Sequence, residues 1–285
     1  MFSESVVRVS VDPEVALFVA QTPGPASRTL LVIHGGPDWD HSYLRSPLAE
    51  LAGRHRLVLP DLRGCGRSTR GLADDQYHPD AVVADLLALL DALRLAEVDV
   101  LGFSYGGLIA QRLAVAAPDR VRRLIIASSS VLPVDEADFG TWPERDRRLT
   151  AEAKAWADSS LSGPDLTRAL AVAGAPANVW RRAALPGYLR LLDEVRFSGE
   201  WLRPWQAGVL ASPRFPDPVE RLADLDAPIL LLHGRQDTRF PVTLVDRTVE
   251  LIPSACGVVI EDAGHMTHVD QPTRWLAAVA DFLAL

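Results

Sequence analysis

One serine of this chain has the surroundings of a catalytic nucleophile. Ser104 is the centre of Gly102-Phe103-Ser104-Tyr105-Gly106, between an apolar run at 98–101 and a helical pattern at 108–117. A serine in such a strand–turn–helix unit stands on a sharp turn above a sheet, and the flanking glycines avoid crowding there. A serine hydroxyl becomes a good nucleophile only when a neighbouring imidazole takes its proton. The motif therefore predicts acyl transfer and requires a base, an orienting acid and an oxyanion hole elsewhere in the chain.

The spacing of the sequence offers His265 as the base and Asp237 as the acid. Asp237 follows an apolar run at 229–233 by a short loop, and His265 follows a second run at 258–260. The ends of parallel strands meet at one edge of a sheet, where open α/β folds bind ligands. The chain order Ser-Asp-His is that of hydrolases with this serine turn, and the acid would orient the imidazole. The alternatives are His268 as base, and Asp262 or Asp135 as acid.

Two backbone N–H groups are candidates for the oxyanion hole. Tyr105 follows the serine at the start of the predicted helix, where N–H groups point outward. Gly36 belongs to the loop His34-Gly35-Gly36-Pro37, which follows another apolar run, and a glycine there lets the backbone approach the substrate closely. Each such donor stabilises a transition state by about 3 kcal/mol.

The elements that must position these residues alternate along the chain. A weak alternation at 6–19 predicts an antiparallel hairpin. Buried strands are predicted at 29–33, 56–60, 98–101, 121–128, 229–233 and 257–260, and helices at 43–52, 79–93, 108–117, 243–251 and 272–283. Strands that alternate with helices require right-handed crossovers, so the fold class is α/β with a mostly parallel sheet flanked by helices.

The middle of the chain has a different pattern. Residues 133–222 contain no comparable apolar run, and helical stretches there are interrupted by prolines. We interpret 133–222 as a helical cap inserted into an α/β core formed by 1–132 and 223–285. Its aromatic side chains could line an apolar pocket or form the core of the cap itself. Five of the seven tryptophans lie in this segment: Trp142, Trp156, Trp180, Trp201 and Trp205.

Composition bears on whether the protein binds nucleic acid, a membrane or a metal. The net charge of −8 gives no electrostatic reason to bind nucleic acid or an anionic membrane. Cys65 and Cys256 are far apart and are not spaced for a metal site, and Cys65 is interpreted as a packed side chain. No signal peptide and no apolar run of membrane-spanning length is evident, so we expect a cytoplasmic protein without metal or cofactor. Among the 29 basic residues, Lys154 is the one lysine.

Over essentially its whole length the sequence resembles the α/β-hydrolase superfamily, and within it the proline iminopeptidases. His34-Gly35-Gly36-Pro37 is similar to their H-G-G-P-G loop, and the elbow Gly102-Phe103-Ser104-Tyr105-Gly106-Gly107 is similar to their G-x-S-W-G-G. A third match, to D-Q-R-G-x-G-R-S, is Asp61-Leu62-Arg63-Gly64-Cys65-Gly66-Arg67-Ser68. The resemblance implies that Ser104 is the nucleophile, His265 the base and Asp237 the orienting acid.

The sequence also departs from the iminopeptidase pattern. Asp38 replaces the last glycine of the loop, and Leu62 replaces a glutamine. The E-N-H-Y-F-like stretch, whose glutamate binds the free amine of the substrate, is absent, and Glu194 and Glu200 are the nearest substitutes. We expect a serine hydrolase that releases N-terminal proline or cleaves a small amide. The alternatives are a carboxylic ester or lactone hydrolase and, outside the enzymes, a ligand-binding protein on a hydrolase fold.

Overall fold

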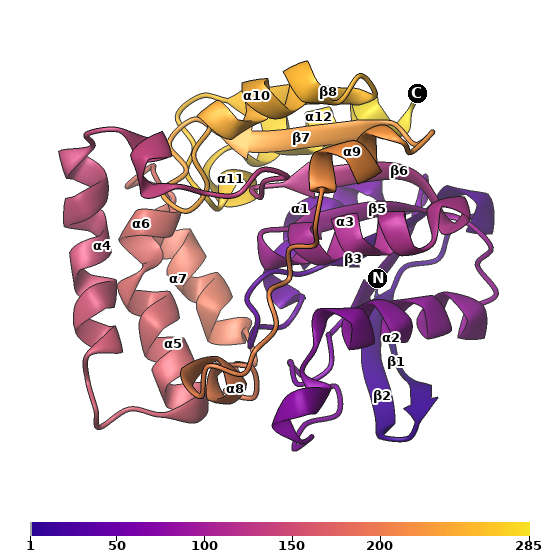
Figure 1. Ribbon diagram of the computed structural model, residues 1–285, viewed down its shortest axis with the longest axis horizontal. Coiled ribbons are helices and arrows are strands. Elements are labelled where there is room, and N and C mark those ends of the chain that lie inside the picture. The colour runs from indigo at the N-terminus through magenta and orange to yellow at the C-terminus, as the bar shows by residue number, and fades with distance from the viewer. Residues whose placement is uncertain (1) are drawn as a thin grey trace.

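A single mixed sheet forms the centre of the molecule (Figure 1). The computed structural model describes residues 2–285, and within them eight strands follow the spatial order β1-β2-β4-β3-β5-β6-β7-β8. The antiparallel hairpin of β1 and β2 pairs with β4, and all other pairings are parallel. The strands are β1 (Ser3–Val11), β2 (Glu14–Gln21), β3 (Thr29–Ile33), β4 (Arg56–Pro60), β5 (Val98–Phe103), β6 (Val121–Ala127), β7 (Ile229–Gly234) and β8 (Ala255–Ile260).

Helices cover both faces of the sheet, which explains why the central strands are continuous apolar runs. In β3, Leu31 and Ile33 belong to one buried cluster, and Leu30 and Val32 belong to the cluster on the opposite face. The first cluster includes side chains of α2 (Pro79–Ala92), α3 (Tyr105–Ala116) and α10 (Thr243–Leu251). The second includes side chains of α1 (Ser42–Leu48) and α12 (Pro272–Leu283). The predicted α/β class is thereby confirmed.

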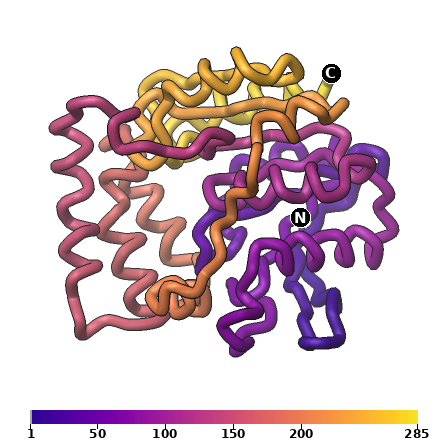
Figure 2. The backbone as a smooth tube through the Cα atoms, viewed as in Figure 1, coloured from indigo at the N-terminus to yellow at the C-terminus, as the bar shows by residue number. Residues whose placement is uncertain are grey.

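A helical insert between β6 and β7 forms a separate layer over one end of the sheet (Figure 1). Figure 2 shows the extended connection that leads from α8 (Leu202–Gln206) back to the core, where α9 (Pro218–Ala223) contacts α3. The exposed Lys154 lies on α4 (Pro143–Trp156), two residues before the end of the helix. The insert contains α4 (Pro143–Trp156), α5 (Gly163–Ala173), α6 (Ala175–Asn178), α7 (Leu185–Glu194) and α8 (Leu202–Gln206).

Two helices differ from the sequence-based expectation. The helix predicted at 43–52 ends earlier, because the α-helical part contains Pro47 in its last turn and continues only as a short 3-10 turn. A one-turn helix, α11 (Thr267–Asp270), follows His265 and has no apolar repeat long enough to predict it. Within residues 2–285, no helix has both the length and the apolar character needed to cross a bilayer.

Candidate active site

Ser104 occupies the turn between β5 and α3 in a strained backbone conformation. Its φ is 54° and its ψ is −119°, a region that costs a non-glycine residue about 1–3 kcal/mol. Two flanking glycines permit this turn, because a Cβ on Gly102 would lie 2.3 Å from the carbonyl oxygen of Gly106. A Cβ on Gly106 would lie 2.2 Å from the carbonyl oxygen of Ile33. The neighbouring strand is therefore packed against the turn that presents the serine.

Ser104, His265 and Asp237 form one hydrogen-bonded chain. The His265 Nε2 lies 3.0 Å from the Ser104 Oγ, and the His265 Nδ1 lies 2.9 Å from the Asp237 Oδ2. Because an ionised carboxylate only accepts hydrogen bonds, Nδ1 carries the proton and Nε2 is free to accept the proton of the serine. The three side chains come from the loops after β5, β7 and β8, as the sheet-edge argument predicts.

The environment of Asp237 keeps its carboxylate ionised. Burial alone raises the pKa of this fully buried group, but the adjacent His265 and the hydrogen bonds from its surroundings outweigh burial and lower the pKa. The backbone N–H groups of Arg239 and Phe240 donate to Oδ1 over 2.7 and 3.1 Å. His233 Nε2 lies 3.3 Å from the other oxygen. The acid is thus held by four groups that favour its charged form.

The alternative base and acids occupy other positions. His268 is buried among Tyr43, Phe103 and Trp275, and within residues 2–285 neither of its ring nitrogens has a hydrogen-bond partner. Burial lowers the pKa of His268 to about 3, so this ring is neutral at physiological pH. Asp262 forms an exposed ion pair with Arg181, and Asp135 caps a short 3-10 helix.

The loop after β3 brings Gly36 to the same cavity as Ser104 and Tyr105. Its Gly35 N–H donates to the Tyr43 hydroxyl over 2.8 Å, which fixes the loop against α1. Gly36 has a φ of +120°, a conformation that L side chains rarely adopt. The positions predicted for the oxyanion donors, Gly36 and Tyr105, therefore line the same cavity as the serine.

Asp38 connects this loop to the cap. Its carboxylate accepts hydrogen bonds from the Ser198 hydroxyl over 2.7 Å, the Trp201 N–H over 3.0 Å and the Leu202 N–H over 2.8 Å. The carbonyl oxygen of Asp38 also accepts from the Ser198 N–H over 2.9 Å. Burial raises the pKa of Asp38, while these hydrogen bonds lower it and compensate in part. Asp38, which departs from the iminopeptidase loop, thus connects the start of α8 and the segment before it to the core through hydrogen bonds.

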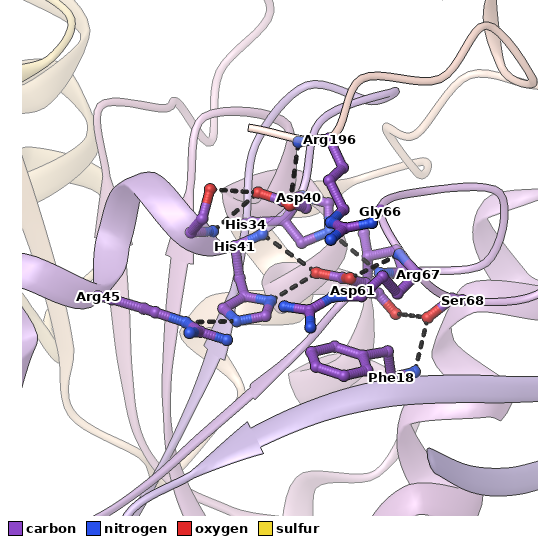
Figure 3. A network of polar contacts seen from close by, with 12 residues as sticks. Phe18, His34, Asp40, His41, Arg45, Asp61, Gly66, Arg67, Ser68 and Arg196 are labelled. Carbon is purple, nitrogen blue, oxygen red and sulfur yellow. Dashed lines mark hydrogen bonds and ion pairs between the residues drawn. The ribbon is translucent and has the colours of Figure 1, made fainter. Parts of the chain in front are cut away.

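Asp61 is the centre of a second network of polar contacts (Figure 3). One carboxylate oxygen of Asp61 pairs with the His41 Nδ1, and the other accepts from the Arg67 N–H over 2.8 Å. Arg45 Nε donates to the His41 Nε2 over 2.9 Å, so His41 donates its Nδ1 proton to Asp61. The close packing of Gly66 leaves no room for a Cβ beside the carboxylate. The Asp61–Ser68 motif therefore has a structural role, and its Leu62 N–H contacts His34 of the loop after β3.

Cap and core line an open cavity of about 710 Å³ whose wall includes Ser104 and His265. Most of its wall is apolar or aromatic, a composition typical of small-molecule sites. The main charged feature is the ion pair between Glu152 of α4 and Arg239 of the Asp237 loop, and Arg239 also donates to the Asn178 Oδ1 over 2.9 Å. Of the cap tryptophans, Trp156, Trp201 and Trp205 line this cavity.

The two glutamates predicted to bind an amine lie outside the cavity wall. Glu200 accepts hydrogen bonds from the Tyr77 hydroxyl over 2.5 Å and from the Gly71 N–H over 3.0 Å. Glu194 is exposed at the end of α7. Two carboxyl-bearing residues do line the cavity, Asp38 and Glu152, and the sequence analysis did not identify Glu152. One turn of α4 separates it from Trp156, but this spacing alone does not distinguish a cavity-lining glutamate from a solvated one.

The cysteines and the potential metal ligands of the described residues do not form a second reactive site. Cys65 is buried and Cys256 is exposed, and both are free thiols. Burial raises the pKa of the Cys65 thiol well above its usual value, which disfavours a thiolate nucleophile. Throughout residues 2–285, no three histidine, cysteine, aspartate or glutamate side chains gather in a metal-binding arrangement.

The combination of fold, elbow and cap identifies the class of protein. The family profile described as alpha/beta hydrolase fold matches residues 28–272, so the chain belongs to that family. It is 31% identical over 272 residues to the 2-hydroxymuconate semialdehyde hydrolase of Pseudomonas sp. (strain CF600), an alignment that covers 90% of this chain and 86% of that protein.

Two further relatives have different activities in their names. The chain is 27% identical over 269 residues to the proline iminopeptidase of Heyndrickxia coagulans, which covers 89% of this chain and 90% of that one. Among solved structures, a thermophilic esterase from Thermogutta terrifontis superposes with a TM-score of 0.73 at 24% identity, over 100% of this chain and 98% of the other. The relatives define a hydrolase and divide among three kinds of substrate.

Proposed function

We propose that this α/β hydrolase cleaves carboxylic esters through an acyl-enzyme on Ser104. The observation that supports the proposal most directly is the chain of contacts from Ser104 through His265 to Asp237, with separations of 3.0 and 2.9 Å. Nucleophile and base are within hydrogen-bond reach, and a third group orients the base, which is the arrangement that activates a serine.

In the proposed reaction each group has one role. The Ser104 Oγ attacks the ester carbonyl as His265 Nε2 takes its proton, and the resulting oxyanion would accept hydrogen bonds from the N–H groups of Gly36 and Tyr105. His265 then donates that proton to the leaving alcohol, which leaves an acyl group on Ser104. In the second half, His265 takes a proton from water as the water oxygen attacks the acyl carbonyl. The bond from this carbon to the Ser104 Oγ then breaks, His265 returns the proton to Oγ, and the acid leaves.

The charges in the cavity favour an ester over an N-terminal prolyl peptide. A substrate with a free amine needs an unpaired carboxylate near the serine, because a buried ammonium group is costly without a partner. Two carboxyl-bearing residues line the cavity: Glu152 is paired with Arg239, and the Asp38 carboxylate accepts three hydrogen bonds from the cap segment. Glu200 and Glu194 are directed elsewhere. A neutral ester requires no such partner.

Cleavage of a carbon–carbon bond next to a ketone is the second candidate. It is favoured by the 31% identity to a 2-hydroxymuconate semialdehyde hydrolase and by Arg239, whose guanidinium could pair with a substrate carboxylate in exchange for Glu152. The iminopeptidase activity is supported by the 27% identical relative and by the H-G-G-P loop.

One panel of substrates separates these activities. The purified protein and its Ser104→Ala variant are compared on p-nitrophenyl butyrate, proline p-nitroanilide and 2-hydroxymuconate semialdehyde. We expect turnover of the butyrate ester that Ser104→Ala reduces by at least about 10³-fold. Turnover of the anilide or of the semialdehyde alone would replace the ester proposal. Saturable binding of all three without turnover would instead favour the ligand-binding protein.

A further inference from the structure

Two tryptophans of the cap stand at the edge of the cavity and remain in contact with water. Trp156 is the last residue of α4 and is 41% exposed, and Trp205 in α8 is 54% exposed. Their rings meet edge to face, with centroids 4.9 Å apart. Both also line the cavity that contains Ser104, so each indole has one part in the cavity and one part in solvent.

Other tryptophans of the cap do not share this position. Trp201 is fully buried, with its indole N–H donating to the Arg63 carbonyl over 2.8 Å, and therefore serves the core of the molecule. Trp142 and Trp180 pack on each other with centroids 5.9 Å apart and are not part of the cavity wall. The exposure of Trp156 and Trp205 is thus specific to the place where α4 and α8 approach the cavity.

Apolar side chains line the same cavity as this pair and the serine. Leu170 and Ala171 of α5, with Leu202 and Leu210, line the cavity together with the two indoles, and Val209 beside them is largely exposed. An exposed apolar surface that continues into a cavity gains free energy when an apolar ligand covers it. The cavity volume of about 710 Å³ lies in the range that encloses drug-sized ligands and is far larger than an acetyl group requires.

We infer that Trp156 and Trp205 form the subsite for the acyl chain of the substrate, and that the substrate class is esters of medium-length alkyl or arylalkyl acids. This inference rests on the ester hydrolysis proposed above. The acyl chain extends from Ser104 along the apolar side chains of the cavity and ends against the indole pair, where it covers part of the surface that the two rings expose to water. Short acyl groups do not reach the pair, so they lose this contribution to binding.

The test compares p-nitrophenyl acetate with p-nitrophenyl octanoate. Each methylene group that becomes buried can raise kcat/KM by a factor of up to about four. We expect the wild-type protein to favour octanoate over acetate by at least about tenfold. Trp156→Ala and Trp205→Ala each reduce kcat/KM for octanoate by about tenfold and change that for acetate less than about twofold.

Two control variants separate recognition from a general effect on folding. Trp142→Ala removes an indole at the opposite end of α4, where the side chain is not part of the cavity wall, and leaves the octanoate-to-acetate ratio unchanged. Trp156→Phe keeps an aromatic ring at the subsite and restores most of the ratio. The inference is wrong if both esters lose activity equally in Trp156→Ala and Trp205→Ala, or if neither variant changes the ratio.

A binding measurement keeps this inference separate from the proposed reaction. Calorimetry on the Ser104→Ala variant compares sodium octanoate with sodium acetate, and the same measurement is made with Trp156→Ala added. If no ester is hydrolysed, the proposed function fails, whereas tighter octanoate binding that depends on Trp156 still supports an apolar-chain subsite. If octanoate binds no more tightly than acetate, or binds equally well without Trp156, the subsite fails even where esters are hydrolysed.

Discussion

Asp38 and Trp201 are 163 residues apart in sequence, and the Trp201 N–H donates a hydrogen bond of 3.0 Å to the Asp38 carboxylate. Asp38 is part of the loop that carries Gly36, and the indole ring of Trp201 packs edge to face against Tyr105, with centroids 5.8 Å apart. One cap residue therefore contacts both sides of the predicted oxyanion hole. The position of the cap and the geometry of this hole are mechanically connected.

Replacement of Asp38 tests this connection. Its φ of 73° is strained for an aspartate, so Asp38→Gly relieves about 1 kcal/mol. The same change removes three hydrogen bonds to a buried carboxylate, each worth about 1.5–3 kcal/mol. We expect Asp38→Gly to lower the free energy of unfolding by at least about 2 kcal/mol in urea titrations, and to lower kcat more than it raises KM. Asp38→Asn, which keeps one acceptor oxygen, has a smaller effect on both. An Asp38→Gly variant of unchanged stability would contradict the connection.

The strained turn at Ser104 predicts opposite effects on stability and activity. Both Ser104→Ala and Ser104→Gly remove the nucleophile, but only glycine relaxes the backbone at φ 54°. The relief of about 1–3 kcal/mol exceeds the extra entropy that glycine loses on folding, about 0.5–1 kcal/mol. We expect Ser104→Gly to be about 1 kcal/mol more stable than Ser104→Ala in thermal unfolding. Equal stabilities would show that the surrounding structure does not impose this conformation.

The ion pair between Glu152 and Arg239 predicts a modest effect on ester hydrolysis. The two side chains are 25% and 26% exposed, so a double-mutant cycle with Glu152→Gln and Arg239→Gln should give a coupling of about 0.5–1 kcal/mol in stability. We expect Glu152→Gln to change kcat/KM for p-nitrophenyl butyrate less than about threefold. If it instead abolishes turnover of proline p-nitroanilide, Glu152 binds the substrate amine and the peptidase activity is correct.

The Asp61 network predicts a pH-dependent contribution to stability. Burial alone raises the pKa of Asp61, but the hydrogen bonds from His41 and from the Arg67 N–H stabilise the carboxylate and outweigh burial, so the folded-state pKa lies below its ordinary value. A lowered pKa adds stability above the unfolded value of about 3.9, and this stability is lost as the pH falls through the folded-state pKa. We expect Asp61→Asn to be about 3 kcal/mol less stable than the wild type at pH 7. The difference in Tm should shrink as the pH is lowered from 5 to 3, and a constant difference would exclude titration of Asp61 as the cause.

The parts of the fold that follow from local patterns could be predicted from the sequence. A strand buried on both faces, such as Thr29–Ile33, must be apolar throughout, and its length and limits are therefore visible. The contacts between Ser104, Asp237 and His265 could also be anticipated, because parallel strands bring their carboxyl ends to a single edge of the sheet.

The cap contacts could not be predicted in the same way. Glu200, chosen for its position in the cap, accepts from Tyr77 of the core, and Glu152 faces the cavity although nothing in its neighbours marks it. These differences depend on how α4 and α8 lie over the sheet, which is decided by contacts between residues more than one hundred positions apart. Asp38 did have a signal, since an aspartate stood where the resembling family has glycine.

The solitary lysine of the chain has a practical consequence for studies of the cap. Lys154 lies on the exposed side of α4 and stands between Glu152 and Trp156 in the sequence. No other residue of the sequence carries a side-chain amine. An acylating fluorophore directed at that amine would attach within one helical turn of the cavity rim without any engineered cysteine. Its emission would then report the arrival of a ligand at the indole pair directly, in the unmutated protein and during turnover.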